Sequence, residues 1–397
     1  MNVKIKKGKI GGAISAIPSK SYAHRISICN FLSGKEPTAR CNGFSSNDIA
    51  VTETCLKTLL SGGKTLDAGE SGSTLRFLLP LVAALGGEYE FIGHGKLMER
   101  PNEELFSVFA LHGVSAKKDK TIKVKGKLTS GEYRIRGDIS SQYISGLLMA
   151  LPILDGDSEI VLTTPLCSAP YVDITLEVLS AFGVKIDKLE NGYKVYGNQK
   201  YFGVLAPEGD WSNMAFFLVL GAINGKLSVT GMNLNSVQGD KKIIEILKLA
   251  GASVTIENGV ITVKESNLTP FVFDAEDCPD LVPITAALAA CATGKSVINS
   301  IERLKIKESD RDESTIALLK AFNIKAESDG HSLTVYGGNP KAGEVDSFND
   351  HRIVMTAAVL ASVCDGESKI INAQAVNKSY PSFFNDYNSV GGNADEF

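Results

Sequence analysis

The sequence predicts an α/β protein in which one structural unit is repeated six times and the repeats group into globular domains. Four apolar segments begin at Ser140, Asp210, Asp280 and Asp350, each 70 residues after the one before. Short runs rich in β-branched residues follow most of these segments, and Asn258-Gly259 separates two such runs. A constant offset of this kind indicates internal repeats more than general α/β patterning.

The first recurring element is an apolar helix rich in small residues. Two earlier copies begin at Ser19 and Ser71, and Ser or Asp at such a position predicts a helix N-cap. Glycines follow the ends of these helices at Gly34, Gly86, Gly156, Gly225, Gly294 and Gly366. Because the helices are apolar on all sides, we expect them to be buried.

A strand, an amphipathic helix and a pair of short strands complete the unit. The strands include SEIVLTT, KLSVTG and KSVINS, and the amphipathic helices include EELFSVFALHGV, ITLEVLSAFGV, KIIEILKLAGA and STIALLKAFNI. In SVTIENGVITV, the Asn-Gly pair predicts a tight hairpin turn. Units with sheets and two kinds of helix favour globular domains over an open solenoid.

Composition limits the class of protein. A chain of 397 residues is long enough for two or more domains. No apolar run approaches the ~18 residues that span a membrane. The segment 1–9 alternates Lys with Val and Ile, lacks the apolar stretch of a signal peptide, and is predicted to be an edge strand. We therefore expect a cytoplasmic protein that does not bind membranes.

Cysteine, histidine and charge exclude further classes. The seven cysteines form no CxxC pair, and none of the five histidines has a metal-ligand spacing to another. This pattern predicts reduced thiols and no metal site. The formal net charge of −4 argues against nonspecific nucleic-acid binding. An anionic substrate would need locally clustered Lys and Arg side chains.

Such cations occur at the predicted helix starts and in a few loops. They lie in PSKSYAHR, ESGSTLR, MERP, IKESDR, NDHR and VNKSYP, beside the polar segments GDISSQ, SAPY and CPD. A cation at a helix start opposes the helix dipole, so it is explained better by a bound anion than by helix stability. The repeated pattern predicts binding of more than one anionic group.

These motifs, in this order from Lys20 to Lys378, resemble those of the 5-enolpyruvylshikimate-3-phosphate synthase family. The resemblance implies a two-domain inside-out α/β barrel with six βαβαββ repeats, three per domain, and buried parallel helices. One domain would hold residues 12–207, on the shikimate-3-phosphate side, and the other residues 1–11 with 208–397. The active site would lie in the cleft between the domains, which closes on substrate.

The resemblance also implies an activity and its residues. The enzyme would transfer the enolpyruvyl group of phosphoenolpyruvate to the 5-hydroxyl of shikimate-3-phosphate, without cofactor or metal, in the shikimate pathway of aromatic amino acid biosynthesis. Proton transfer would involve Asp280, Glu308, Lys307 and Lys20. Shikimate-3-phosphate would be bound by Lys20, Ser21, Arg25, Ser140, Ser141, Gln142, Ser168, Tyr171, Asp280 and Lys307. Phosphoenolpyruvate would be bound by Lys20, Gly72, Arg100, Gln142, Arg311, Arg352 and Lys378.

Four positions depart from the usual family pattern. Glu70 and Arg303 stand where Asn is common, Ser73 replaces a frequent Thr, and Phe77 replaces a frequent Pro or Leu. Glyphosate inhibits many members of the family at the phosphoenolpyruvate site. The departures therefore bear on loop geometry and glyphosate sensitivity more than on the reaction.

Two other functions compete with this one. UDP-N-acetylglucosamine enolpyruvyl transferase would have the same fold, but that family begins its first motif with Lys-Asn, whereas this chain has Lys20-Ser21. It also carries a reactive Cys in a loop that here reads GHGKLMERP. A clamp or scaffold would spread basic residues along helix faces to follow nucleic acid. We expect a monomer whose partners are its two small-molecule substrates.

Overall fold

The computed structural model describes residues 1–39, 41 and 43–397. The chain forms two compact units, each described here by itself. The larger unit comprises Met1–Ser19 and Glu208–Phe397, and the smaller unit comprises Lys20–Pro207. Residues 12–19 were expected with the smaller unit. The structure places them in the larger one, because strand β2 (Ile10–Ser15) pairs in parallel with β11 (Gly225–Thr230).

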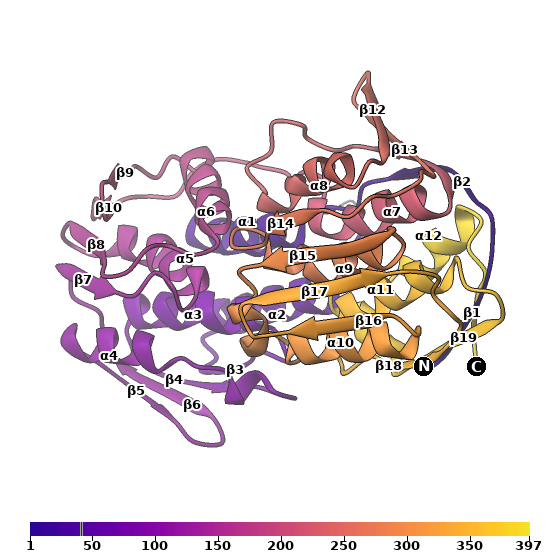
Figure 1. Cartoon of the computed structure of the whole chain (residues 1–397). Coiled ribbons are helices and arrows are strands. Elements are labelled where there is room, and N and C mark those ends of the chain that lie inside the picture. Colours follow the sequence, from indigo (N-terminus) through magenta and orange to yellow (C-terminus); the bar gives the residue numbers. More distant parts are fainter. Residues whose placement is uncertain (40, 42) are drawn as a thin grey trace. The chain divides into compact units, whose positions relative to one another are not determined.

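The larger unit contains three four-stranded sheets and six α-helices in its described residues. The sheets have the orders β18-β19-β1-β20, β12-β13-β11-β2 and β14-β15-β17-β16. The helices are α7 (Trp211–Ile223), α8 (Ile243–Leu249), α9 (Val282–Ala290), α10 (Arg311–Ala321), α11 (His351–Ala361) and α12 (Phe383–Ser389). The other strands are β1 (Val3–Lys6), β12 (Ser253–Glu257), β13 (Val260–Lys264), β14 (Val272–Asp274), β15 (Gly294–Asn299), β16 (Lys325–Ser328), β17 (Ser332–Gly337), β18 (Glu344–Asp346), β19 (Glu367–Ile371) and β20 (Ala394–Glu396). Figure 1 shows the β14-β15-β17-β16 sheet in front of α9 and α10.

The prediction of an edge strand at the N-terminus was wrong. Strand β1 pairs antiparallel with β19 on one side and with β20 on the other, so it lies inside its sheet. Val3 and Ile5 are buried while Lys4 and Lys6 remain accessible. Alternation of this kind shows which face of a strand is buried, but it does not show how many neighbours the strand has.

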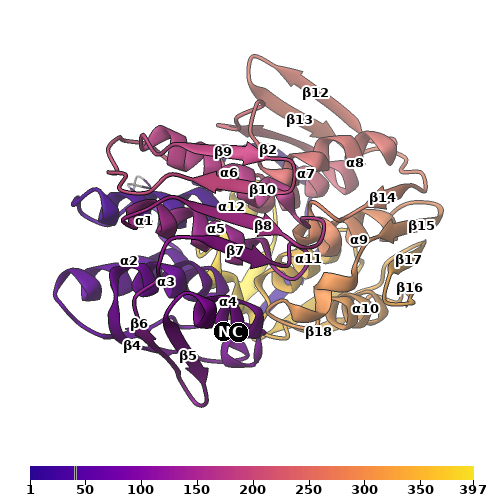
Figure 2. The same cartoon turned by 90° about the vertical axis from the view of Figure 1, so that its left-hand side faces the viewer.

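The smaller unit contains two four-stranded sheets in its described residues, with the orders β3-β4-β6-β5 and β7-β8-β10-β9. Its helices are α1 (Lys20–Leu32), α2 (Asn47–Leu60), α3 (Gly72–Leu85), α4 (Glu103–Leu111), α5 (Ser141–Ala150) and α6 (Ala169–Ala181). Its strands are β3 (Thr65–Asp67), β4 (Gly87–Ile92), β5 (Val114–Lys118), β6 (Ile122–Gly126), β7 (Glu132–Ile135), β8 (Ser158–Leu162), β9 (Ile186–Leu189) and β10 (Gly192–Val195). Figure 2 shows β4, β5 and β6 along one side of α2 and α3.

The first repeat of the smaller unit departs from the predicted pattern. Residues 20–64, apart from 40 and 42, contain α1 and α2 but no strand. The other repeats keep their sheets, so the expected α/β fold class is confirmed while the regular strand content of the first copy is not observed. Its sequence between the helices, GKEPTARCNGF, lacks the β-branched runs on which the strand predictions rested.

The prediction of buried apolar helices is confirmed for α3, α5, α7, α9 and α11, whereas α1 is only partly buried. Every residue of α9 and α11 is buried, as are nearly all residues of α3, α5 and α7. Side chains of Ser71, Ser140, Asp210 and Asp350 accept hydrogen bonds from backbone N–H groups in the first turn of their helices. Asp280 was expected to act in the same way but lies instead in a short 3-10 helix, η4 (Pro279–Leu281).

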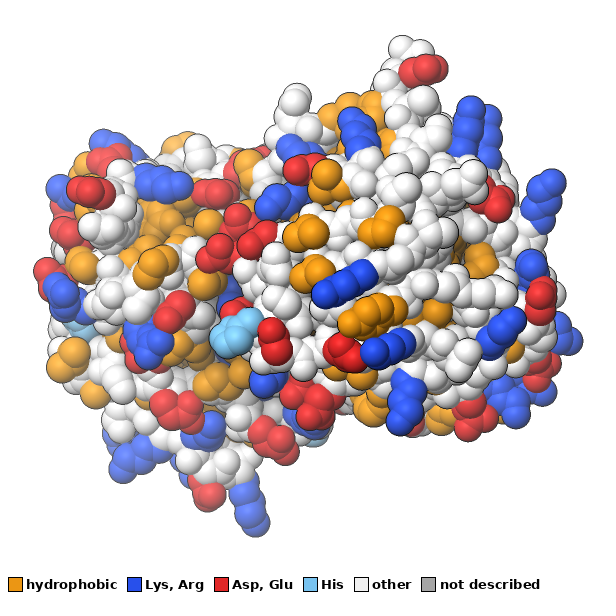
Figure 3. Space-filling model, in the orientation of Figure 1, with side chains coloured by type: hydrophobic (Ala, Val, Ile, Leu, Met, Phe, Trp, Pro, Cys, Tyr) orange, Lys and Arg blue, Asp and Glu red, His pale blue; other side chains and the backbone are white. Residues whose placement is uncertain are grey.

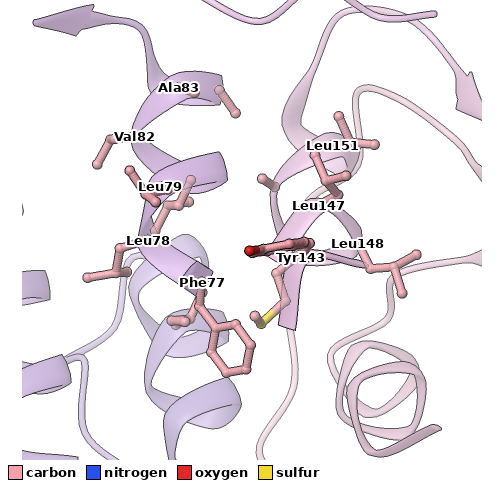
Figure 4. Close-up of a cluster of buried hydrophobic side chains, with 14 of the residues drawn as sticks. Phe77, Leu78, Leu79, Val82, Ala83, Tyr143, Leu147, Leu148 and Leu151 are labelled. Atoms are coloured by element: carbon pink, nitrogen blue, oxygen red, sulfur yellow. The ribbon is translucent and has the colours of Figure 1, made fainter. Parts of the chain in front are cut away.

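Close packing of α3 against α5 places the starts of these helices side by side. Apolar side chains of both helices meet in the core of the smaller unit (Figure 4), and each fully buried Leu or Phe contributes about 1.5–3 kcal/mol. Gly146 allows the close approach, because a Cβ atom there would lie 2.5 Å from the carbonyl oxygen of Arg76. The packing holds Gln142, on α5, next to Ser73 and Arg76 on α3.

The hairpin turn was predicted correctly. Strands β12 and β13 pair antiparallel through Glu257 and Val260. The two residues between them, Asn258 and Gly259, have φ values of 51° and 77°. Positive φ at both central positions is the type I′ geometry that favours Asn-Gly.

Candidate active site

In the larger unit, the carboxylate of Asp280 is surrounded by three cations. Its Oδ1 atom lies 3.2 Å from Lys307 Nζ and 2.8 Å from Arg311 Nη1, and Oδ2 lies 2.9 Å from Arg352 Nη2. The cations come from three places in the chain: the end of a 3-10 helix η5 (Glu302–Ile306), the start of α10 and the start of α11. Together with Glu308 and Asp350, these residues form what we call the Asp280 cluster.

Burial and charge act in opposite directions on Asp280. Burial alone would raise the pKa of its carboxyl group, but attraction to Arg352, Lys307 and Arg311 outweighs burial and holds this pKa well below its usual value. Burial lowers the pKa of Lys307 to about 8, against the attraction of Asp280. Asp280 is therefore an ionised acceptor, whereas Lys307 can gain or lose a proton near neutral pH.

Arg311 holds the carboxylates of the cluster together. Its guanidinium donates to Asp280, to Glu308 Oε2 at 2.6 Å and to Asp350 Oδ2 at 2.9 Å. Arg311 is only 1% exposed. Asp350 also accepts from the backbone N–H of Arg352 at 2.9 Å. The same carboxylate therefore both caps α11 and pairs with Arg311. This arrangement suits Arg311 to orient the acidic side chains.

The last predicted cation of this unit is close to the same helix start. Lys378 lies at the end of the 3-10 helix η6 (Ala373–Lys378), and its Nζ atom donates to the carbonyl of Asn349 at 2.6 Å. Asn349 directly precedes Asp350. The larger unit thus brings together Asp280, Lys307, Glu308, Arg311 and Arg352, and Lys378 is linked to this group through Asn349.

In the smaller unit, Lys20 begins α1 and pairs with an acid that the sequence had not singled out. Lys20 Nζ lies 2.7 Å from Asp48 Oδ2, in the first turn of α2, and both side chains are mostly buried. Nothing in the sequence near Asp48 distinguishes it from other acids at helix starts. Ser21 follows Lys20 in α1, and its carbonyl accepts from Arg25 Nη1 at 2.7 Å.

Arg25 is buried and makes several hydrogen bonds within the protein. Its Nε donates to Thr175 Oγ1 at 2.6 Å, and its Nη2 donates to the carbonyl of Tyr171 at 2.8 Å. Its guanidinium carbon lies 4.8 Å from the centre of the Phe77 ring. Burial lowers the pKa of Arg25 to about 10, which leaves it positively charged at neutral pH. Arg25 fixes α1 against α6, so its direct contact with substrate stays a prediction.

Gly72, the first residue of α3, lies against the guanidinium of Arg100. A Cβ atom at Gly72 would be 2.5 Å from Arg100 Nη1 and 2.9 Å from Cζ. An alanine at position 72 would therefore require the end of the Arg100 side chain to shift. Gln142 joins the same region, because its Nε2 donates to Ser73 Oγ at 3.0 Å and its Oε1 accepts from Arg76 Nη1 at 2.8 Å. Arg76 lies in the SGSTLR motif but is not one of the predicted site residues.

The predicted phosphate-binding serines lie at two helix starts. Ser140 caps α5 and accepts from the backbone N–H of Gln142 at 3.3 Å, and Ser141 is the first residue of that helix. Ser168 precedes α6 in the left-handed conformation, with φ of 54°, and Tyr171 follows in the first turn. Helix starts of this kind, with their backbone N–H groups and the positive end of the helix dipole, suit an anion.

The described residues have further general properties. Among them, no helix combines the length and apolar character that a membrane crossing requires. No group of three or more His, Cys, Asp and Glu residues in the described part of the chain could hold a metal ion. On the face drawn in Figure 3, basic and acidic side chains are interspersed and not gathered by sign.

Comparison with known proteins gives a consistent result over the whole chain. The family model of EPSP synthase (3-phosphoshikimate 1-carboxyvinyltransferase) matches residues 58–387. The 3-phosphoshikimate 1-carboxyvinyltransferase of Clostridium kluyveri is 40% identical and covers 100% of this chain and 98% of its own length. The protein of the same name from Clostridium novyi is 38% identical, with coverage of 100% and 99%.

Solved structures agree on the fold. The EPSP synthase of Acinetobacter baumannii superposes with a TM-score of 0.80 at 22% identity, and all of both chains is covered. The enolpyruvyl transferase NikO of Streptomyces tendae has a TM-score of 0.78 at 16% identity, covering 99% of this chain and 98% of its own. The family model and the full-length relatives lead to one conclusion: this chain belongs to the EPSP synthase (3-phosphoshikimate 1-carboxyvinyltransferase) family.

Proposed function

We propose that this chain transfers the enolpyruvyl group of phosphoenolpyruvate to the 5-hydroxyl of shikimate-3-phosphate and releases phosphate. The observation that carries this function is the match to relatives of that name, 40% identical over the whole chain. The residues support it, since cations lie at helix starts in each unit and a cluster of acids lies beside Lys307.

The Asp280 cluster supplies the groups that such a reaction needs. The 5-hydroxyl adds to C2 of phosphoenolpyruvate while C3 gains a proton, which gives a tetrahedral ketal phosphate. Phosphate then leaves as the new methyl group loses a proton. Two carboxylates, Asp280 and Glu308, and Lys307 with its pKa of about 8 would exchange these protons. Lys20 is the further candidate for proton transfer.

Arginine and lysine would anchor the phosphate and carboxylate of phosphoenolpyruvate. The planar guanidinium binds two oxygens at once, which suits Arg100 and Arg352 to this task. Lys378, Lys20 and Gln142 would complete the site. Because Gly72 has no side chain, its backbone N–H group and the guanidinium of Arg100 could both approach the anion closely. Contact of Arg311 with phosphoenolpyruvate remains a prediction, and its three carboxylate partners support an orienting role as well.

Shikimate-3-phosphate would be held by the helix starts of the smaller unit. Hydroxyl groups and backbone N–H groups at the starts of α5 and α6 suit its phosphate. The full proposed set is Lys20, Ser21, Arg25, Ser140, Ser141, Gln142, Ser168 and Tyr171, with Asp280 and Lys307 from the larger unit.

Alanine variants of Arg100 and Arg352 test the anchoring roles. Each lost charge-assisted hydrogen bond is worth about 1.5–3 kcal/mol, so the KM for phosphoenolpyruvate should rise about 10- to 100-fold. The KM for shikimate-3-phosphate should change much less. Arg134→Ala is the control, because Arg134 is exposed and pairs with Glu132 on the same strand. Unchanged kinetics in both variants would contradict the assignment.

The alternative acceptor is UDP-N-acetylglucosamine. Lys20-Ser21 and the cysteine-free loop 93–101 argue against it. Phosphate release with each acceptor separates the two functions. The cytoplasmic location and the monomeric state remain predictions.

A further inference from the structure

Asp240 is a buried acid of the larger unit that none of the motifs contained. It lies in the 3-10 helix η3 (Gly239–Lys242) and is 4% exposed. Gln238, two residues before Asp240, is hydrogen-bonded at the start of α7. Gln238 accepts from the backbone N–H of Trp211 at 3.2 Å and donates to the carbonyl of Gly209 at 2.9 Å. This places Asp240 beside the first turn of α7.

Ser212 connects Asp240 to the Asp280 cluster. Its hydroxyl accepts a hydrogen bond of 2.7 Å from Arg352 Nη2, and Ser212 also lies close enough to the Asp240 carboxyl group to lower its pKa. The same Nη2 atom donates to Asp280 Oδ2 at 2.9 Å. A continuous chain of contacts thus runs from Asp240 through Ser212 and Arg352 to Asp280.

Stability alone does not explain an acid at this position. Within the described residues, Asp240 Oδ1 finds no hydrogen-bond donor, and a buried polar atom without a partner is costly. Burial, followed by repulsion from Asp280, raises the pKa of Asp240 to about 6, although Arg352 and Ser212 lower it and Asp210 adds to the rise. The nearby thiol of Cys278 is itself buried, and burial raises its pKa.

We propose that Asp240, acting through Ser212, is a positioning residue for the transfer reaction. A hydroxyl has one proton to donate. While Asp240 is ionised, that proton is directed to Asp240, and a lone pair of the same oxygen faces Arg352. The guanidinium is thereby held in the orientation in which it also bonds Asp280. This inference rests on the proposed role of Arg352 as an anchor for phosphoenolpyruvate.

The test compares Asp240→Asn with wild type at two pH values. Asn keeps the shape but carries no charge, so the KM for phosphoenolpyruvate should be about 2- to 10-fold higher at about pH 7.5, the range expected for one net hydrogen bond. The kcat should change little. At about pH 5, where wild-type Asp240 is mostly protonated, the two KM values should converge. Titration of the substrate affects both proteins equally and cancels from the ratio.

A matched control separates this effect from a general effect of buried acids. Asp312 resembles Asp240 in its burial, because it is 5% exposed and burial raises the pKa of its carboxyl group. Its Oδ1 atom also finds no hydrogen-bond donor within the described residues, and its Oδ2 atom accepts from Ser328 Oγ at 2.7 Å. It is not part of the chain from Asp240 to Asp280. For Asp312→Asn, the KM ratio should stay near 1 at both pH values.

Ser212→Ala provides the second variant. If Asp240 acts through Ser212, the double variant should resemble Ser212→Ala, and the two effects should not add. A KM ratio of 1 for Asp240→Asn at pH 7.5, a ratio that does not change with pH, or additive effects would each overturn the inference. Unchanged KM in Arg352→Ala would instead remove the anchoring role itself, and with it this inference, so the two failures can be told apart.

Discussion

At the scale of single residues, the contact between Gly72 and Arg100 makes a sharp prediction. In Gly72→Ala the methyl group would meet the guanidinium at 2.5 Å and displace it. The KM for phosphoenolpyruvate should therefore rise. The inhibition constant of glyphosate, which is longer than the substrate, should rise by a larger factor. If Gly72 is only a turn glycine, the thermal midpoint should fall and the ratio of the two constants should not change.

Glu308 has two possible roles that one substitution separates. It lies 2.6 Å from Arg311, so it could act in proton transfer or serve only as an ion-pair partner. Glu308→Gln keeps the shape and a hydrogen-bond acceptor but removes the acid. For a proton-transfer group, kcat should fall about 10²- to 10⁴-fold with both substrates still bound. Near-native kcat with a lower thermal midpoint would show that Glu308 is structural.

Lys307 should set an alkaline limit on activity. Its folded pKa of about 8 is below the usual value of 10.5, so the ammonium form is the one lost as pH rises through 8. Between these two values only the unfolded chain holds the proton, so the contribution of Lys307 to stability rises there. We predict that kcat/KM falls above pH 8 and that Lys307→Arg moves this fall to higher pH. A profile unchanged by the substitution would exclude Lys307 as its cause.

The residues that sequence reasoning found and missed differ in one physical respect. Arg100, Arg352 and Lys378 stand in short motifs, so the sequence identified them directly. Asp48 reaches Lys20 only through the packing of α1 against α2, 28 positions further along the chain, and Asp240 lies near Arg352, more than 100 positions away. No local pattern records such contacts, and the structure was needed to find them.

At the scale of elements, the turn between β12 and β13 can be tested without touching the site. Gly259 has φ of 77° and open space around its Cβ position, so Gly259→Ala would add backbone strain alone. Strain of this kind costs about 1 kcal/mol and should lower the thermal midpoint by about 2–4 °C.

Gly11→Ala is the control for that turn, because Gly11 has no positive φ and its added Cβ would meet only ordinary contact at 3.8 Å. Its midpoint should hardly change, and both variants should keep full activity. If the thermal midpoint fell equally in the two variants, the positive φ of Gly259 in the type I′ turn would not be the source of the strain.

Helices were easier to predict than strand neighbours. An apolar run such as 282–290 must be buried in any arrangement, and the 70-residue offset fixed its place in the repeat. The partners of β1 and β2 come from residues more than 200 positions away. Pairing over such distances depends on the whole fold, and this explains the errors at the N-terminal strand and at the first domain boundary.

At the scale of the whole molecule, the chain has a net charge of −4 but acts on anions in our proposal. The conflict is resolved locally, because Lys20, Arg100, Lys307 and Arg352 stand at helix starts or in loops beside them. Each unit supplies its own set of cations and helix N-termini. The proposal therefore requires both units for activity and requires both substrates to be anionic.

The most direct test of this account measures the products of the reaction. Purified protein would be mixed with phosphoenolpyruvate and either shikimate-3-phosphate or UDP-N-acetylglucosamine, and both phosphate release and the phosphorylated products would be followed by ³¹P NMR. The account predicts phosphate release and a new enolpyruvyl ether with shikimate-3-phosphate alone, and both should form about 10²- to 10⁴-fold more slowly in Glu308→Gln. Turnover with UDP-N-acetylglucosamine, or no turnover with shikimate-3-phosphate by a folded protein, would contradict it.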